Sequence, residues 1–170
     1  PAPAPCPVVE TPPPGPTVPY EEMWAASPHN DAASEAFVHW DETEDKAVPA
    51  GCATCHSSTG YQDFLGADGS EAGKVDAAAP IGTTVDCVAC HNPATAALTD
   101  VTFPSGLVVS DAGDSARCLV CHQGRASKVQ VDAQIEKFAA TDLDAVVAPI
   151  KEGDAEVRFG FINIHYYAAA

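Results

Sequence analysis

One pentapeptide pattern, Cys-x-x-Cys-His, occurs three times in this 170-residue chain, at residues 52–56, 87–91 and 118–122. Two cysteines three positions apart lie on the same side of one helical turn, and the histidine follows directly after them. The apolar runs between the copies are short, and Pro and Gly are frequent, so the chain has little sequence from which to build a core. The pattern therefore predicts a chain that folds around the groups bound at these three places.

Paired cysteines occur in zinc knuckles, in thiol–disulfide redox pairs and at covalent haem. A zinc site needs two knuckles and no histidine after each pair, and a thioredoxin-like pair occurs once, in a βαβ context. Covalent haem requires the whole pattern, because each thiol bonds one vinyl group of the porphyrin and the imidazole binds the iron. The sequence thus predicts three haem c groups, attached at Cys52, Cys55, Cys87, Cys90, Cys118 and Cys121, with proximal ligands His56, His91 and His122.

The remaining histidines equal the haems in number. Six histidines are present, and those outside the pentads are His29, His39 and His165. The simplest assignment makes each of them a distal ligand, so that all three irons have bis-histidine ligation. The single methionine, Met23, offers His/Met ligation to one haem at most. For each spare histidine the alternative is an ordinary solvated or structurally bonded side chain.

The chain is strongly acidic, with 24 acidic and 8 basic side chains and a formal net charge of -16. This charge excludes nucleic acid as a partner, because phosphate binding requires basic patches. The negative charge is better suited to cationic redox proteins, divalent cations or mineral surfaces as partners. The alternative is that the charge simply keeps an exported protein soluble. Arg117 and Arg125 are candidates to pair with haem propionates, or are plain surface charges.

The sequence predicts an exported protein that does not span a membrane. No apolar run approaches the roughly 20 residues that cross a bilayer. Haem c is attached outside the cytoplasmic membrane, so we expect a leader to have been removed before Pro1. The odd cysteine, Cys6, is expected to be an inert thiol or an inter-subunit disulfide rather than a lipid anchor.

The expected fold is mostly irregular coil with a few short α-helices and a small β-hairpin, wrapped around three haems. Residues 1–20 hold nine prolines and should form an extended arm, and residues 21–170 a single trihaem domain. Helices are predicted over residues 31–39, 127–138 and 143–147, with a helix-like last segment around His165, and the hairpin over residues 101–109. The Asp-rich stretch at residues 63–76 is interpreted as a solvated turn rather than a calcium loop.

Several segments between the pentads resemble multihaem c-type cytochromes of the extracellular or cell-surface kind. They are FVHWD at residues 37–41, DFLGADG at 63–69, CHQGR at 121–125 and GFINIHYYAAA at 160–170, and the resemblance covers about residues 30–170. It implies closely packed, mostly bis-His haems that pass electrons outward. Some such cytochromes polymerise into filaments in which a distal histidine comes from the next subunit. Related chains often continue past this length and carry more haems.

The leading hypothesis is an electron conduit without substrate chemistry, extracellular or at the cell surface, whose partners are redox proteins and other copies of itself. A filament subunit is preferred, because the arm, Cys6 and His29 suit a chain that reaches into its neighbour. A discrete periplasmic or surface carrier is the alternative. A multihaem reductase is the second alternative, and it would need one open iron, for instance if His29 did not bind.

Overall fold

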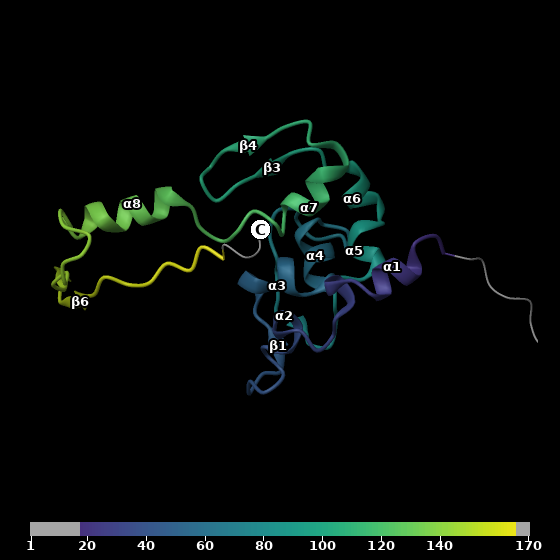
Figure 1. The fold of residues 1–170 in the computed structure, drawn as a ribbon, viewed down its shortest axis with the longest axis horizontal. Helices are drawn as coiled ribbons and strands as arrows, with labels where there is room; N and C mark the ends of the chain where they lie inside the picture. Colours follow the sequence, from purple (N-terminus) through teal and green to yellow (C-terminus); the bar gives the residue numbers. More distant parts are fainter. Residues whose placement is uncertain (1–17, 166–170) are drawn as a thin grey trace, which may run out of the picture.

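The computed structural model describes residues 18–165 of the chain. Over that range it forms short helices and three two-stranded sheets joined by much irregular backbone (Figure 1). The longest described helix has 10 residues and the longest described strands have 3. The expected coil-rich fold with short helices is confirmed, and the expected hairpin is one of three small sheets.

The first half of the described chain carries α1 (Glu21–Ala25), the 3-10 turn η1 (Pro28–Asn30), α2 (Glu35–Val38), β1 (Ala47–Val48), α3 (Ala50–His56), α4 (Ser58–Phe64) and β2 (Ala79–Pro80). The second half carries α5 (Cys87–Cys90), α6 (Pro93–Ala97), β3 (Val101–Thr102), β4 (Val108–Val109), η2 (Gly113–Ser115), α7 (Ala116–Leu119), α8 (Lys128–Lys137), β5 (Ile150–Glu152) and β6 (Ala155–Val157). The strands pair antiparallel as β1 with β2, β3 with β4 and β5 with β6.

Each pentad lies on or directly after a short helix. Helix α3 includes the whole first pentad, α5 ends at Cys90 with His91 as its C-cap residue, and α7 leads into Cys121. Helix α4 passes very close to α3, because a Cβ atom on Gly60 would lie 2.4 Å from the Ala53 carbonyl oxygen. This close approach fixes the first pentad against the centre of the molecule.

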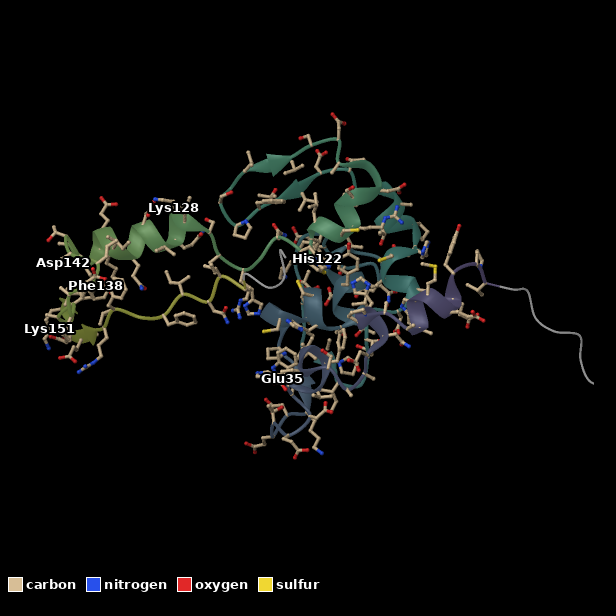
Figure 2. All side chains as sticks on the ribbon, in the orientation of Figure 1. Glu35, His122, Lys128, Phe138, Asp142 and Lys151 are labelled. Carbon is tan, nitrogen blue, oxygen red and sulfur yellow. The ribbon has the colours of Figure 1, made fainter. Side chains whose placement is uncertain are left out.

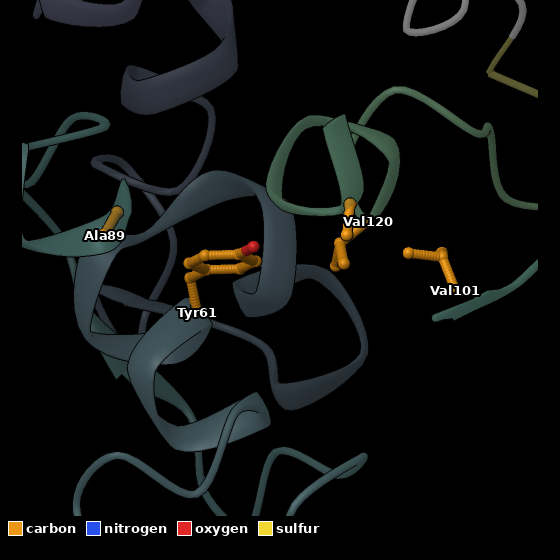
Figure 3. Packing of buried hydrophobic residues seen from close by; sticks show 5 residues of the cluster. Tyr61, Ala89, Val101 and Val120 are labelled. Carbon is orange, nitrogen blue, oxygen red and sulfur yellow. The ribbon is translucent and has the colours of Figure 1, made fainter. Parts of the chain in front are cut away.

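The apolar core is small and lies between the pentad helices. Its main cluster consists of Tyr61, Ala89, Val101, Ala116 and Val120, contributed by α4, α5, β3 and the α7 region. Figure 3 shows the Tyr61 ring between Ala89 and Val120. A second cluster contains Val48, Ala53 and Ala79. Helix α4 therefore serves as the support against which the second and third pentads pack.

Residues 126–163 form a lobe that extends away from the pentad helices. Helix α8 runs outward, β5 and β6 form the outer hairpin, and the chain returns alongside α8 (Figure 1). Figure 2 shows Phe138, Asp142 and Lys151 together at the far end, well away from His122. The ring of Phe138 packs on Phe159, with centroids 5.3 Å apart. Backbone N–H of Arg125 donates to Ile164 O at 3.2 Å, so the lobe begins and ends at one place.

Two of the predicted elements are confirmed and three differ. The hairpin at residues 101–109 is β3–β4, and the helix at 127–138 is α8, whose N-cap Ser127 forms a capping box with Gln130. The helix predicted at 31–39 shrinks to α2. Residues 143–145 form a turn and a bend in place of the helix predicted at 143–147, and residues 158–165 are irregular rather than helix-like.

The three differences have one physical cause. Side-chain oxygens of Asp31, Asp142 and Asn163 accept the backbone N–H two residues ahead, at 3.1, 3.0 and 3.0 Å. Such Asx turns offer the backbone an alternative to helical hydrogen bonds. The predicted arm falls largely within residues 1–17, which, like Cys6 and residues 166–170, lie outside the described residues.

Candidate functional site

His56, the histidine of the first pentad, faces His165. Their ring centroids are 6.3 Å apart and their planes make an angle of 77°. Two imidazoles on opposite sides of one metal, each at a bond length of about 2 Å, have ring centroids roughly 6 Å apart. The pair is thus placed as two axial ligands of one iron would be.

The surroundings of both rings favour metal binding. Nδ1 of His56 lies 2.7 Å from the Ala36 carbonyl oxygen, so Nδ1–H donates there and Nε2 is left for a metal. Burial, and then the charge of Arg125, lower the pKa of His165 and favour its neutral form. Within the described part of the chain, its buried Nδ1 has no hydrogen-bond partner that would compete with a metal for this ring.

His122, the histidine of the third pentad, faces His29 in the same manner. Their ring centroids are 6.1 Å apart, with an angle of 76° between the planes. Two hydrogen bonds hold the η1 segment in place: Val85 N–H donates to His29 O at 3.0 Å, and Trp24 Nε1–H donates to Val85 O at 2.9 Å. His29, which looked like an ordinary loop histidine in the sequence, therefore lies beside a proximal ligand of its own chain.

A pocket lies between His29 and His122. Among the residues that line it are Cys118 and Cys121, the two cysteines of the third pentad. Tyr61 forms part of the wall and its hydroxyl donates to Arg117 O at 3.0 Å. An apolar space that two imidazoles and two thiols surround fits a covalently bound porphyrin.

The second pentad is arranged differently. His91 and Cys87 are both exposed. Among the ring pairs found in residues 18–165, none includes His91. The structure therefore brings no spare imidazole of the described chain to the second site.

The remaining spare histidine, His39, is exposed and has no proximal partner among the described ring pairs. Its side chain is 59% exposed, and Nδ1 lies 2.7 Å from Glu35 Oε1. The ring of Trp40 packs on the ring of His39, with centroids 4.9 Å apart, and on the ring of His56, with centroids 5.2 Å apart. Glu35 and Trp40 were not predicted as site residues, although the spacing of Glu35 four residues before His39 was a visible signal.

The two candidate propionate partners have different surroundings. The Arg117 side chain has partners within the protein: its guanidinium donates to Cys90 O at 2.9 Å and forms an ion pair with Asp114 at 2.5 Å. Arg125 lies close enough to Cys55 and His165 to act on both electrostatically. Its guanidinium makes no hydrogen bond or ion pair in the described part of the chain, so Arg125 is the better placed of the two for a propionate.

The residues present fit three covalent haems. All six pentad cysteines are free thiols on or beside a helical turn, and two of the three pentad histidines face a second imidazole. Among residues 18–165 no helix is long and apolar enough to cross a membrane.

The comparisons with known proteins give one match. The model of a family described as cytochrome c7 and related cytochrome c matches residues 35–123, just over half of the chain. The match runs from α2 to the residue after the third pentad, so it includes all three pentads and His39 but neither His29 nor His165. No curated protein and no solved structure matches the chain.

Proposed function

The chain belongs to the family of cytochrome c7 and related cytochromes c, and we propose that this trihaem electron-transfer protein works as one subunit of an extracellular filament. The three haem c groups of the family correspond to the three pentads. Members of the family are exported electron carriers, which agrees with the export expected from covalent haem. When bound, each haem supplies an iron that changes by one electron between the ferric and ferrous states.

The histidine pairs support bis-His ligation at the first and third haems. The separations of 6.3 Å for His56 with His165 and 6.1 Å for His122 with His29 suit iron between each pair. With both axial positions filled, neither iron has room for a substrate. This supports electron transfer without substrate chemistry at these two sites.

The filament proposal rests on one observation: His39 has a carboxylate partner suited to a metal ligand, but it forms no ring pair with a pentad histidine among residues 18–165. Metal-binding histidines commonly donate the second ring N–H to a carboxylate, which raises the basicity of the other nitrogen. Glu35 accepts in this way from Nδ1–H of His39. The lone pair of Nε2, on the same exposed ring, is then available to a metal. We propose that this nitrogen binds the His91 iron of the next subunit.

Such a contact is compatible with open assembly. His39 and His91 are different surface positions of one chain, so the contact repeats head-to-tail unless a two-fold dimer forms both His39–His91 contacts at once. A head-to-tail contact that does not close into a ring extends into a filament. His29, expected from the sequence to reach into a neighbour, lies beside His122 instead, so His39 takes that role in the proposal.

The decisive experiment measures assembly size by light scattering on a size-exclusion column, with detection at the haem Soret band. The native chain should form species far larger than 17.5 kDa, and His39→Ala should reduce them to monomers that keep three haems. Lys74→Ala, which removes another exposed side chain, is the control and should assemble normally. A native monomer would contradict the filament and leave the discrete carrier.

Carbon monoxide binding tests the alternative of a multihaem reductase. The exposed side chain of His91 is the observation that favours this alternative. CO binds reduced haem iron only where an axial position is free. The assembled native protein should bind none, whereas monomeric His39→Ala should bind one CO per chain. CO binding by the assembled protein would instead favour a haem that is open for substrate.

A further inference from the structure

The three residues directly before the second pentad, Thr84, Val85 and Asp86, are hydrogen-bonded to two different parts of the molecule. This 84–86 segment belongs to no helix or strand. No regular ladder satisfies its backbone polar groups, so its place is set by its individual contacts. Because consecutive residues of an extended chain direct their N–H and C=O groups to opposite sides, such a segment can join two neighbours.

Ser58, near the start of α4, holds one side of the 84–86 segment. The residue is 2% exposed, and its hydroxyl makes two hydrogen bonds to the segment. Oγ–H donates to Thr84 O at 2.6 Å, and Asp86 N–H donates to Oγ at 2.7 Å. Ser58 follows His56 by two positions, so these bonds fix the approach to the second pentad against the end of the first.

Val85, in the middle of the 84–86 segment, makes its hydrogen bonds with the N-terminal part of the described chain. Its N–H donates to His29 O at 3.0 Å, and its carbonyl oxygen accepts from Trp24 Nε1–H at 2.9 Å. Trp24 belongs to α1 and His29 to η1. Both of these elements are therefore tied to one residue of the segment.

The position of His29 depends on these contacts. The residue is exposed and lies in η1, a 3-10 turn of three residues whose N-cap Ser27 makes no side-chain cap hydrogen bond. A turn of this length is not stable by itself. The bonds through Val85 therefore keep the ring of His29 beside that of His122, at the centroid separation of 6.1 Å.

We propose that Ser58 and Trp24 are positioning residues for His29, which act through the 84–86 segment. The inference rests on the proposed function in one respect, namely that His29 binds the iron at His122. Ser58 fixes the segment against α4, and the segment in turn fixes Trp24 and His29. The backbone that leads into the second pentad thus keeps the third haem closed to small molecules.

Carbon monoxide measures how firmly His29 is held, because it binds a reduced haem only while the distal ligand is away. Its apparent affinity is proportional to the fraction of that haem in the open state. Ser58→Ala removes both hydrogen bonds of the hydroxyl, and Trp24→Phe removes the bond to Val85 but keeps an aromatic ring. In each variant the CO concentration that half-saturates the third haem should fall about fivefold or more, the effect of one lost hydrogen bond.

Thr95→Ala is the matched control for both variants. Thr95 is 1% exposed, and its hydroxyl also makes two hydrogen bonds: it donates to Ala89 O at 2.8 Å and accepts from Asn92 Nδ2–H at 2.7 Å. These bonds lie at the second pentad, but neither involves the 84–86 segment. This variant should lose comparable stability and bind CO at the third haem no better than the native chain.

His29→Ala identifies the CO difference spectrum of the third haem, once the haem content of every variant has been checked. The inference fails if Ser58→Ala or Trp24→Phe needs as much CO as Thr95→Ala while His29→Ala opens the haem, and the bis-His ligation would then stand. If His29→Ala itself binds no additional CO, His29 is not a ligand, and the ligand assignment fails together with the inference. Should Ser58→Ala not retain three haems, Trp24→Phe decides alone.

Discussion

The indole ring of Trp40 packs edge-on against the imidazole of His56, with ring centroids 5.2 Å apart and an angle of 65° between the planes. The same indole meets the exposed ring of His39 at 4.9 Å. Trp40 thus lies between the half-buried His56 and a histidine that faces solvent. In the proposed filament it would connect the ligand of a neighbouring haem to the ligand of the first haem.

Replacing Trp40 with alanine should destabilise the protein and loosen His56. The side chain is half-buried, so the loss of packing should cost about 2 kcal/mol in the free energy of unfolding. The first haem would become more exposed to water, which should lower its midpoint potential. Chemical denaturation and potentiometric titration measure the two effects. Trp40→Phe keeps an aromatic ring and should show less than half of either change; equal effects would mean that ring packing is not the cause.

Alanine at His29 or at His165 tests the two histidine pairs separately. Each variant should leave one iron with a free position, because within residues 18–165 only one imidazole of the pair, His122 or His56, then remains there. We expect one additional CO-binding haem per chain in each variant, measured in the reduced protein after the haem content has been checked. An unchanged CO titration in either variant would show that the deleted histidine is not a ligand.

The sequence was sufficient to predict the chemistry of the site but not its geometry. The Cys-x-x-Cys-His pattern is local, and the family match confirms three haem c groups. Which spare histidine meets which proximal one depends on contacts over long separations. Trp24 donates to Val85 O and Val85 N–H donates to His29 O beside His122, and no local pattern encodes these contacts.

Secondary structure was predictable where local signals agreed. The capping box at Ser127 and Gln130 marks α8 clearly, and Pro104-Ser105-Gly106 marks the turn of the β3–β4 hairpin. The predictions failed where an Asp or Asn side chain accepts a hydrogen bond from a backbone N–H that a helix would have used, as at Asp142 and Asn163. Helix propensity does not reveal that competition, because the same residues also serve as helix N-caps.

Gly60 makes the close approach of α4 to α3 possible, so Gly60→Ala should destabilise the protein. The added Cβ would lie 2.4 Å from Ala53 O and 2.5 Å from Ala53 Cβ, and both neighbours are fixed in a helix. Forced separation of the two helices should cost about 2 kcal/mol in the free energy of unfolding. Gly51→Ala is the matched control: it lies in α3, nothing is within 4 Å of its Cβ position, and it should be neutral or slightly stabilising. Equal stability of both variants in thermal denaturation would contradict the tight crossing.

Gly124 controls the approach of the segment that carries His165. Its φ of +81° favours glycine, and a Cβ there would lie 2.7 Å from Ile164 O. Gly124→Ala should therefore push this segment away and weaken the contact between His165 and His56, beyond the cost of the strained backbone.

Gly153→Ala separates the two effects, because Gly153 has a similar φ of +60° but nothing within 4 Å of its Cβ position. Both variants should lose about 1 kcal/mol in the free energy of unfolding from backbone strain. Only Gly124→Ala should also bind an additional CO when reduced, because only there does the substitution move a haem ligand. If Gly153→Ala gains the same CO binding, strain alone opens the haem, and the contact between Gly124 and Ile164 does not position His165.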